Sequence, residues 1–195
     1  ERYGVSSELA RSYSNVSAMT SAMLLPKAAH RYTQRANEVA LTSQDHATQA
    51  YVRTINSVHF IGHGQWPAAR ETLDQALTLC ESIGDHRRWS EATALTLNLA
   101  AWTGDLDRLA IHARKLVAAA DEGLGSQVAM WAYGWLLWQE SARDAFSEEV
   151  DTAEGELVDW LDSGDELALA DEVLGRGGLL FARLRRNEWT QALAI

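Results

Sequence analysis

Apolar side chains recur at every third or fourth residue along most of this chain, the spacing at which they share one face of an α-helix. The pattern is clearest between Gly64 and Asp105, where two such runs follow each other. Gly84 and Gly104 close the runs, and glycine most easily adopts the left-handed conformation that ends a helix. Asp85 and Asp105 follow, where a carboxylate can cap the next helix. The apolar faces consist of Ala69, Leu73, Ala76, Leu77, Cys80 and Ile83, and then of Ala92, Leu95, Leu99 and Trp102.

The same turn signals recur along the whole chain. One set of predicted turns lies near residues 24, 64, 104, 143 and 187, and a second set lies near 44, 84, 124 and 164. Each set advances by roughly forty residues, which is the signature of a helical repeat. Pro26 fits the first turn of the second helix, where its missing N–H costs little. The predicted hairpins are residues 6–44, 45–84, 85–124, 125–164 and 165–195.

No alternating, strand-type pattern competes with the helical one. We therefore expect an all-α fold, in which about nine or ten helices form a right-handed superhelical array of antiparallel hairpins. Each hairpin of such an array buries its apolar faces only by stacking on its neighbours. The array is expected to be a single repeat domain covering residues 1–195.

Charge is distributed unevenly and limits the classes of partner. Residues 144–172 hold twelve acids and no Lys or Arg, whereas residues 1–44 hold three acids and five bases. The net charge of −10 argues against direct contact with nucleic acid, because phosphate contacts need clustered bases. The contrast between the two ends could instead drive head-to-tail association of copies. No apolar run is long enough to span a membrane.

The ends of the chain and its single cysteine indicate its context. Cys80 cannot form an internal disulfide and suits a reducing cytoplasm. The chain begins at Glu1 rather than Met, and an apolar helical pattern continues through its last residues. We therefore expect it to be part of a longer cytoplasmic polypeptide.

Small residues at matching places in two hairpins carry a resemblance to a known family. Ala29 and Ala69 stand near the start of the second helix of their hairpins, and Ala36 and Ala76 follow seven residues later. With the Gly-Asp corners, these positions resemble tetratricopeptide (TPR) repeats, although the period is longer than the usual thirty-four or so residues. The pattern is most similar to the repeat regions of large bacterial signalling proteins, namely nucleotide cyclases, multidomain ATPases and transcription regulators of the maltose-activator kind.

The resemblance implies a non-enzymatic module for interaction or effector sensing. The sequence departs from the family pattern at Leu109 and Glu149, where the family has small residues. The repeat boundaries there are less well defined by the sequence.

Three groups of residues are candidates for chemistry. His59 and His63 stand four apart, a spacing that can place two imidazoles on one metal, but Phe60 replaces the Glu of the zinc-protease pattern and no third ligand is evident. Cys80 lies on an apolar stripe, which favours an inert core thiol. The acids of residues 144–172 fall on the outer face of an amphipathic helix, as a solvated face or a docking surface. We expect no catalytic residue, no metal site and no cofactor.

Glycines between Gly175 and Gly178 interrupt a helical pattern without forming a phosphate-binding loop, since no Lys follows them. They permit either a close crossing with another helix or a kink in their own helix, and the sequence is compatible with both.

The tryptophans are the most suggestive candidates for binding. Trp131, Trp135 and Trp138 form one stripe at helical spacing, on a helix expected to line the concave side of the array. There they would anchor a peptide or a small apolar ligand, unless they fill the core between hairpins. Tyr51 and His59 complete the candidate binding set. Trp66 and Trp189, at equivalent corners, are expected to be packing residues.

Two functional hypotheses follow. The first is a scaffold that binds a protein segment, which could be another domain of the same parent chain. The second is a sensor that holds a small apolar molecule near the tryptophan stripe in an aromatic-lined concave pocket.

Overall fold

The helical turns predicted at Gly84-Asp85 and Gly104-Asp105 are present in the computed structural model, which describes residues 7–123, 125–143, 148–163 and 169–195. Gly64, Gly84 and Gly104 have φ values of 67°, 69° and 69°, the left-handed region that favours glycine. The Ala47, Arg88 and Arg108 N–H groups donate to Oδ1 of Asp45, Asp85 and Asp105, at 3.1, 2.9 and 3.2 Å. The caps predicted at Asp85 and Asp105 are therefore confirmed, and Asp45 provides a third cap that was not predicted. The predicted turns at residues 124 and 164 lie outside the described residues.

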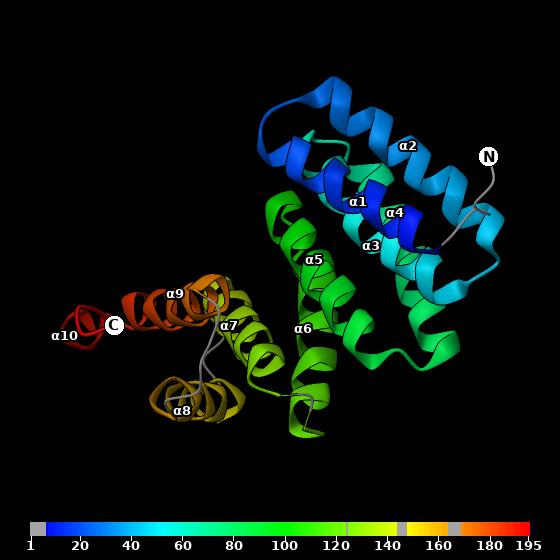
Figure 1. Ribbon diagram of the computed structural model, residues 1–195. Helices are drawn as coiled ribbons and strands as arrows, with labels where there is room; N and C mark the ends of the chain where they lie inside the picture. Colours follow the sequence, from blue (N-terminus) through cyan, green and yellow to red (C-terminus); the bar gives the residue numbers. More distant parts are fainter. Residues whose placement is uncertain (1–6, 124, 144–147, 164–168) are drawn as a thin grey trace. The chain divides into compact units, whose positions relative to one another are not determined.

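The described residues form ten helices and no strand, so the all-α prediction is confirmed for this part of the chain (Figure 1). No helix among them is both long and apolar enough to cross a bilayer. α2 has Pro26 at its first position, as expected. The helices are α1 (Ser7–Ala22), α2 (Pro26–Ser43), α3 (His46–Gly62), α4 (Trp66–Ile83), α5 (His86–Thr103), α6 (Leu106–Asp121), α7 (Ser126–Ala142), α8 (Glu148–Asp162), α9 (Leu169–Arg185) and α10 (Trp189–Ala192).

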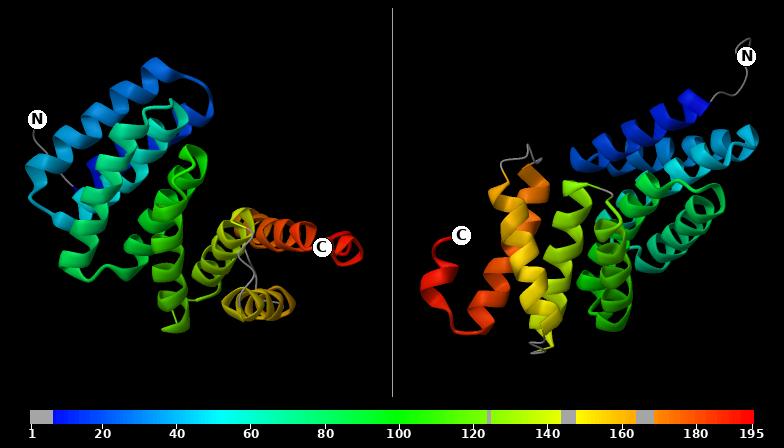
Figure 2. Two further views of the ribbon diagram at one scale, coloured as in Figure 1. Left: turned by 180° about the vertical axis from the view of Figure 1, so that it is seen from behind. Right: turned by 90° about the horizontal axis from the view of Figure 1, so that it is seen from below.

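The chain divides into two compact units, residues 1–99 and residues 100–195, called unit 1 and unit 2 below. The boundary falls inside α5. In unit 1, α1 contacts α2 and α3, and α3 also contacts α2 and α4. In unit 2, α7 contacts α6, α8 and α9, as the views of Figure 2 also show for α8 and α9. Each unit therefore has one central helix, α3 or α7.

The core of unit 1 consists of small and medium side chains that come from successive helices. One cluster joins α1, α2 and α3 and contains Ala10, Ala36, Ala40 and Val52. A second cluster joins α3, α4 and α5 and contains Ile61, Ala69, Leu73, Ala76, Leu77, Ala92 and Leu99. Ala29, Ala36, Ala69 and Ala76 are all fully buried. Residues this small let the helix backbones approach closely.

Two tryptophans are more exposed to solvent than the apolar pattern predicted. Trp102 is 63% exposed in the last turn of α5, although it continues the apolar stripe of that helix. Trp189 is 60% exposed at the start of the one-turn helix α10, so its expected packing role was wrong. Within the described residues α10 contacts α9 alone, which leaves the outer side of Trp189 uncovered. Trp66, at the equivalent corner, packs against the second core cluster as expected.

Glycines bring α7 and α9 into backbone contact. A Cβ atom added to Gly178 would lie 2.8 Å from Gly134 Cα and closer still to Gly134 O. A Cβ atom on Gly134 would lie 3.0 Å from the Leu174 carbonyl oxygen. Of the two possibilities open for the 175–178 glycines, the close helix crossing is thus the one observed. Its partner glycine, Gly134, was not predicted.

We expect Gly178→Ala to destabilise the protein by about 1–3 kcal/mol, because the new methyl group must push the two backbones apart. Gly177→Ala is the matched control. An added Cβ there meets nothing within 4 Å, so replacing glycine in a helix should stabilise the protein by about 0.5–1 kcal/mol. Urea unfolding followed by circular dichroism measures both changes. Equal midpoints for the two variants would refute the close crossing.

Candidate functional site

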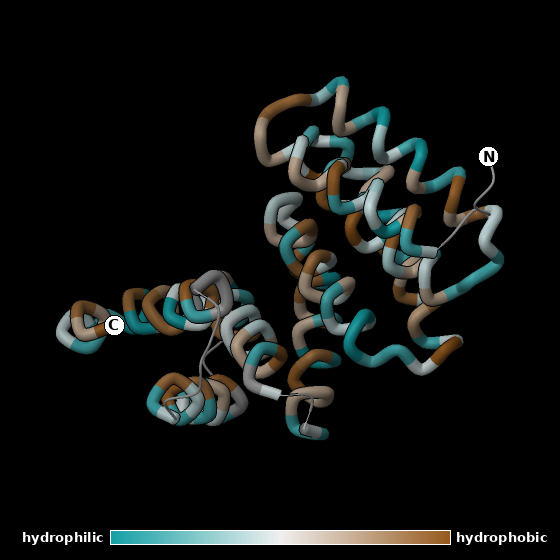
Figure 3. The backbone as a smooth tube through the Cα atoms, viewed as in Figure 1, coloured by the Kyte–Doolittle hydropathy of each residue, from teal (hydrophilic) through white to brown (hydrophobic). Residues whose placement is uncertain are grey.

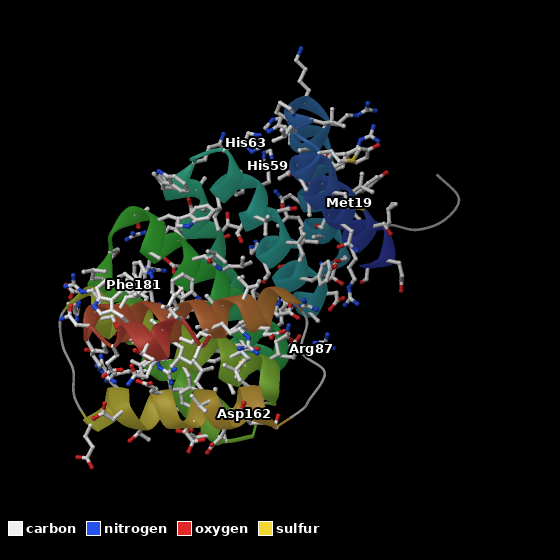
Figure 4. The ribbon with its side chains drawn as sticks, turned by 90° about the vertical axis from the view of Figure 1, so that its left-hand side faces the viewer. Met19, His59, His63, Arg87, Asp162 and Phe181 are labelled. Carbon is white, nitrogen blue, oxygen red and sulfur yellow. The ribbon has the colours of Figure 1, made fainter. Side chains whose placement is uncertain are left out.

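The tryptophan stripe of α7 lies mostly in the interior of unit 2. Trp135 is 6% exposed, and its ring meets Trp138 edge-to-face with centroids 5.8 Å apart. Trp138 stacks on Phe181 of α9 at 5.9 Å and an interplanar angle of 22°. Figure 4 labels Phe181 on α9. Trp131 and Trp138 are half-buried, so they are the part of the stripe that solvent reaches.

Three side chains of α7 bury polar atoms that have no hydrogen-bond partner among the described residues. They are Trp135 Nε1, both amide atoms of Gln139 and Ser141 Oγ. Gln139 and Ser141 are completely buried. An unpaired polar group in an interior costs free energy, commonly about 1–3 kcal/mol, unless a water or a ligand satisfies it. The central helix of unit 2 therefore presents unused donors and acceptors beside the aromatic stripe.

Two other polar side chains of α7 are satisfied by α6. Arg114 Nη2 donates to Glu140 Oε1 at 2.6 Å, and Glu140 is 5% exposed. The Tyr133 hydroxyl donates to Asp121 Oδ1 at 2.7 Å. Burial and this carboxylate raise the pKa of Tyr133. These two contacts fix the register of α7 against α6.

Two arginines lie over the ring of Tyr51, at a junction of three helices. The guanidinium carbon of Arg88, on α5, lies 4.5 Å from the centroid of the Tyr51 ring, and that of Arg11, on α1, lies 5.5 Å away. The Tyr51 hydroxyl donates to Asn15 Oδ1 at 2.5 Å. Arg88 also pairs with Glu91, whereas Arg11 has no carboxylate partner within the described chain. We call Arg11, Tyr51 and Arg88 the Tyr51 sandwich.

His59 occupies a buried position on the same helix. It is 2% exposed, and its Nδ1 lies 3.2 Å from Ser21 Oγ of α1. The ring centroids of His63 and His30 lie 4.3 and 6.1 Å from that of His59. Figure 4 shows His59 and His63 together. Burial, followed by repulsion from His63 and His30, holds the pKa of His59 below its usual value.

The histidines do not form a metal site with other ligands, since no group of three or more suitable side chains occurs in the described ranges. Tyr51 and His59 lie eight residues apart on α3, and the structure does not bring them together. The tryptophan stripe belongs to unit 2. The five candidate residues thus occupy three separate places.

A groove between α3 and α4 was not predicted. Its volume is about 660 Å³, and the aliphatic parts of Pro67 and Leu79 line it together with charged side chains of α4. Arg53 of α3 enters the groove half-buried, and burial lowers the pKa of its guanidinium. Its Nε donates to Gln75 Oε1 at 3.0 Å, and its Nη1 points to the Gln49 carbonyl oxygen at 3.5 Å. No carboxylate pairs with Arg53 in the described part of the chain.

Cys80 is buried, as the apolar stripe predicted. Burial, followed by the charge of Asp85, raises the pKa of the thiol to about 11, so it is neutral at physiological pH. A neutral, enclosed thiol is a poor nucleophile. The prediction that Cys80 lies in the core is confirmed.

The acidic helix α8 is only partly a solvated face. Glu154 Oε1 accepts from Arg183 Nε at 2.9 Å, and Glu154 Oε2 accepts from Arg186 Nη1 at 2.7 Å. Asp151 Oδ1 accepts from Arg186 Nη2 at 2.7 Å. These contacts join α8 to α9 and to the turn that follows it. Residues 144–147 and 164–168 and the side chains of Glu149 and Asp171 lie outside the described residues.

Comparison with known proteins finds no matching family model, no matching curated protein and no matching solved structure.

We expect the free energy of unfolding to fall as the pH drops from 7.5 to 5.5, because of His59. Its pKa in the folded state lies below the usual histidine value of about 6.5, so unfolded chains bind a proton at a higher pH than folded chains do. The loss from one such group cannot exceed about 1.4 kcal/mol per pH unit. Urea unfolding across this range measures it. His59→Gln should remove the slope, whereas the exposed control His46→Gln should keep it; an unchanged slope in His59→Gln would contradict the assignment.

Proposed function

We propose that this chain is a non-enzymatic helical-repeat module that binds an acidic segment of a protein on the face centred on Tyr51. The single observation that carries this function is the Tyr51 sandwich. Tyrosine and arginine are the residues that most often contribute the largest share of binding energy at interfaces. Here they come together from α1, α3 and α5, which are the first helices of three successive hairpins.

Arg11 gives the face its preference for carboxylates. Its guanidinium lies over the Tyr51 ring and has no acidic partner among the residues described, so its N–H groups can bind a carboxylate in a bidentate manner. Asn15 and Tyr51 are linked by a hydrogen bond, which holds the ring in place before a partner arrives. Such preorganisation lowers the entropy cost of binding.

We further propose that the hairpins form a right-handed superhelical, TPR-like array. The helix contacts within each unit support this arrangement. First helices of successive hairpins contact each other, as α1 with α3 and α7 with α9. Second helices also contact the next first helix, as α2 with α3 and α6 with α7. A repeat array requires both kinds of contact.

The module would serve a larger cytoplasmic signalling protein or transcription regulator of bacteria, as the resemblance to TPR repeats implies. Its partner is a protein segment, including another domain of the parent chain, and not nucleic acid. Residues 1–99 hold nine acids and nine bases, so the whole net charge of −10 falls on residues 100–195. Neither unit has the excess of bases that binding to phosphate backbones needs.

The test uses an array of synthetic 15-residue peptides of graded charge, followed by fluorescence polarisation with the best binders. We expect the bound peptides to be rich in Asp and Glu. Arg11→Ala and Tyr51→Ala should each weaken binding about tenfold, or about 1.4 kcal/mol, because they remove the cation or the ring beneath it.

Arg185→Ala is the matched control, since Arg185 is an exposed arginine of α9 in unit 2, whereas the sandwich belongs to unit 1. It should leave the affinity unchanged. Two results would contradict the proposed function. The first is that the protein binds peptides regardless of their charge, and the second is that Arg11→Ala and the wild type bind acidic peptides with equal affinity.

A second candidate function, effector sensing, is favoured by the groove between α3 and α4. Its volume suits a small molecule, and Arg53 offers a half-buried cation without a carboxylate partner in the described residues. A small organic acid would place its carboxylate on Arg53 and its body against Pro67 and Leu79. An alternative location is the aromatic stripe of α7, where the unpaired polar atoms of Trp135 and Gln139 would meet the ligand.

For this candidate we expect monocarboxylic acids at millimolar concentration to raise the melting temperature of the wild type by a few degrees, since a ligand that binds only the folded state stabilises it. Arg53→Met should abolish the increase while keeping the stem of the side chain. Arg35→Met, on the exposed face of α2, is the control. An equal increase for Arg53→Met and wild type in differential scanning fluorimetry would rule out the groove.

A further inference from the structure

The corner between α1 and α2 exposes a continuous apolar surface. Met19, Met23, Leu24 and Leu25 are 64, 66, 85 and 47% exposed. Figure 3 shows this corner as a hydrophobic stretch of the chain. Single exposed apolar residues are common, but a contiguous group of large ones marks an interaction site. Methionine is especially common on such surfaces because its side chain adapts to a partner.

Leu24 is held in this exposed position at a cost. Its φ is 56°, in the left-handed region that a residue with a Cβ rarely adopts. At the corresponding corners of the next two hairpins the chain has Gly64 and Gly104, with φ values of 67° and 69°. A strained residue that the fold does not require is a sign of function.

A ridge of bases continues from this corner along α2. Lys27, Arg31 and Arg35 are spaced four residues apart, and all three are exposed. Arg35 lies over the Tyr13 ring at 5.9 Å, and none of the three has a carboxylate partner within the described residues. The sequence contains no acid between Leu9 and Asn37. We call these three side chains the basic ridge.

α8 carries a ridge of the opposite charge. Glu156, Asp159 and Asp162 are spaced three residues apart and exposed, and none has a basic partner in the described ranges. Figure 4 labels Asp162 at the end of α8. Trp160 and Leu161 lie half-buried at the same end. We call the three carboxylates the acidic ridge.

We propose that the basic ridge of one copy of this chain packs along the acidic ridge of a second copy, with the apolar corner of α1–α2 against Trp160 and Leu161. At a rise of about 1.5 Å per residue, the basic ridge extends over about 12 Å and the acidic ridge over about 9 Å, so the acidic ridge can lie along most of the basic one. The antiparallel orientation brings the start of α2, beside the corner, to the end of α8.

Charge complementarity selects this occupant over two others. Two basic ridges facing each other in a two-fold pair would repel, because like charges would be juxtaposed. A membrane of anionic lipids would attract the basic ridge, but it would repel the acidic ridge and leave its carboxylates without basic partners. A second copy supplies the required carboxylates together with an apolar contact, and this inference does not depend on the function proposed for the Tyr51 sandwich.

The test is sedimentation velocity of the wild type between 5 and about 200 µM in low salt, where screening is weak. We expect concentration-dependent association that weakens at least tenfold when the NaCl concentration is raised to about 0.5 M. The triple variant K27E/R31E/R35E and the triple variant E156K/D159K/D162K should each remain monomeric. An equimolar mixture of the two should associate again, because each restores opposite charges for the other.

The variant Leu24→Gly tests the apolar contact without disturbing the fold. It removes backbone strain, so the melting temperature should not fall, yet association should weaken about tenfold. Leu41→Ser, which changes an exposed leucine inside α2, is the control and should associate like the wild type. Circular dichroism verifies that every variant is helical.

Three outcomes would overturn the inference. In the first, the wild type stays monomeric at about 200 µM. In the second, the mixture of the two triple variants stays monomeric. In the third, each triple variant associates as strongly as the wild type does. Sedimentation with phosphatidylglycerol vesicles tests the membrane alternative. If the wild type binds the vesicles but does not self-associate, and K27E/R31E/R35E does not bind them, the corner is a membrane contact instead.

Discussion

The burial of one central helix from several sides is the constraint on which each unit depends. α3 packs against α1, α2 and α4, and α7 packs against α6, α8 and α9. An α-helix surrounded in this way needs small residues where its neighbours cross it, because large ones would hold the backbones apart. Unit 1 meets this need with alanines such as Ala36 and Ala69, and unit 2 meets it with Gly134 and Gly178.

Because the central helices are buried, recognition depends on the side chains at helix junctions and corners. α3 contributes a ring to the Tyr51 sandwich at one end and the buried His59 at the other. α7 has less accessible surface, and its aromatic side chains mostly pack against one another and against α9. Unit 1 has equal numbers of acids and bases, but most of its described bases without acidic partners lie on α1 and α2, with Arg53 on α3, whereas the excess acids belong to unit 2.

The sequence predicted the features that depend on local chemistry. Gly84 and Gly104 end helices, and Asp85 and Asp105 cap the next ones, because these effects act within a few residues. Periodicity also placed Cys80 in the core correctly. It failed for Trp102, because spacing shows which residues share a face but not whether a neighbour covers that face at the end of a helix.

Contacts between helices could not be predicted from the sequence. Nothing in the chain indicates that Arg11 and Arg88, 77 positions apart, meet the same ring of Tyr51. The groove beside Arg53 was missed for the same reason, since it depends on the distance between α3 and α4. Leu24 was missed because a left-handed leucine contradicts the local preferences on which turn prediction rests.

Native-state hydrogen exchange on the full chain tests the central role of α3 and α7 most directly. Amides of a helix packed on several sides open only when its unit unfolds, whereas those of a peripheral helix open locally. We predict that the amides of α3 and α7 exchange at least about a hundredfold more slowly than those of α2 and α8, the outer helices of the same units. Equal protection of α3 and α2, or of α7 and α8, would contradict the account.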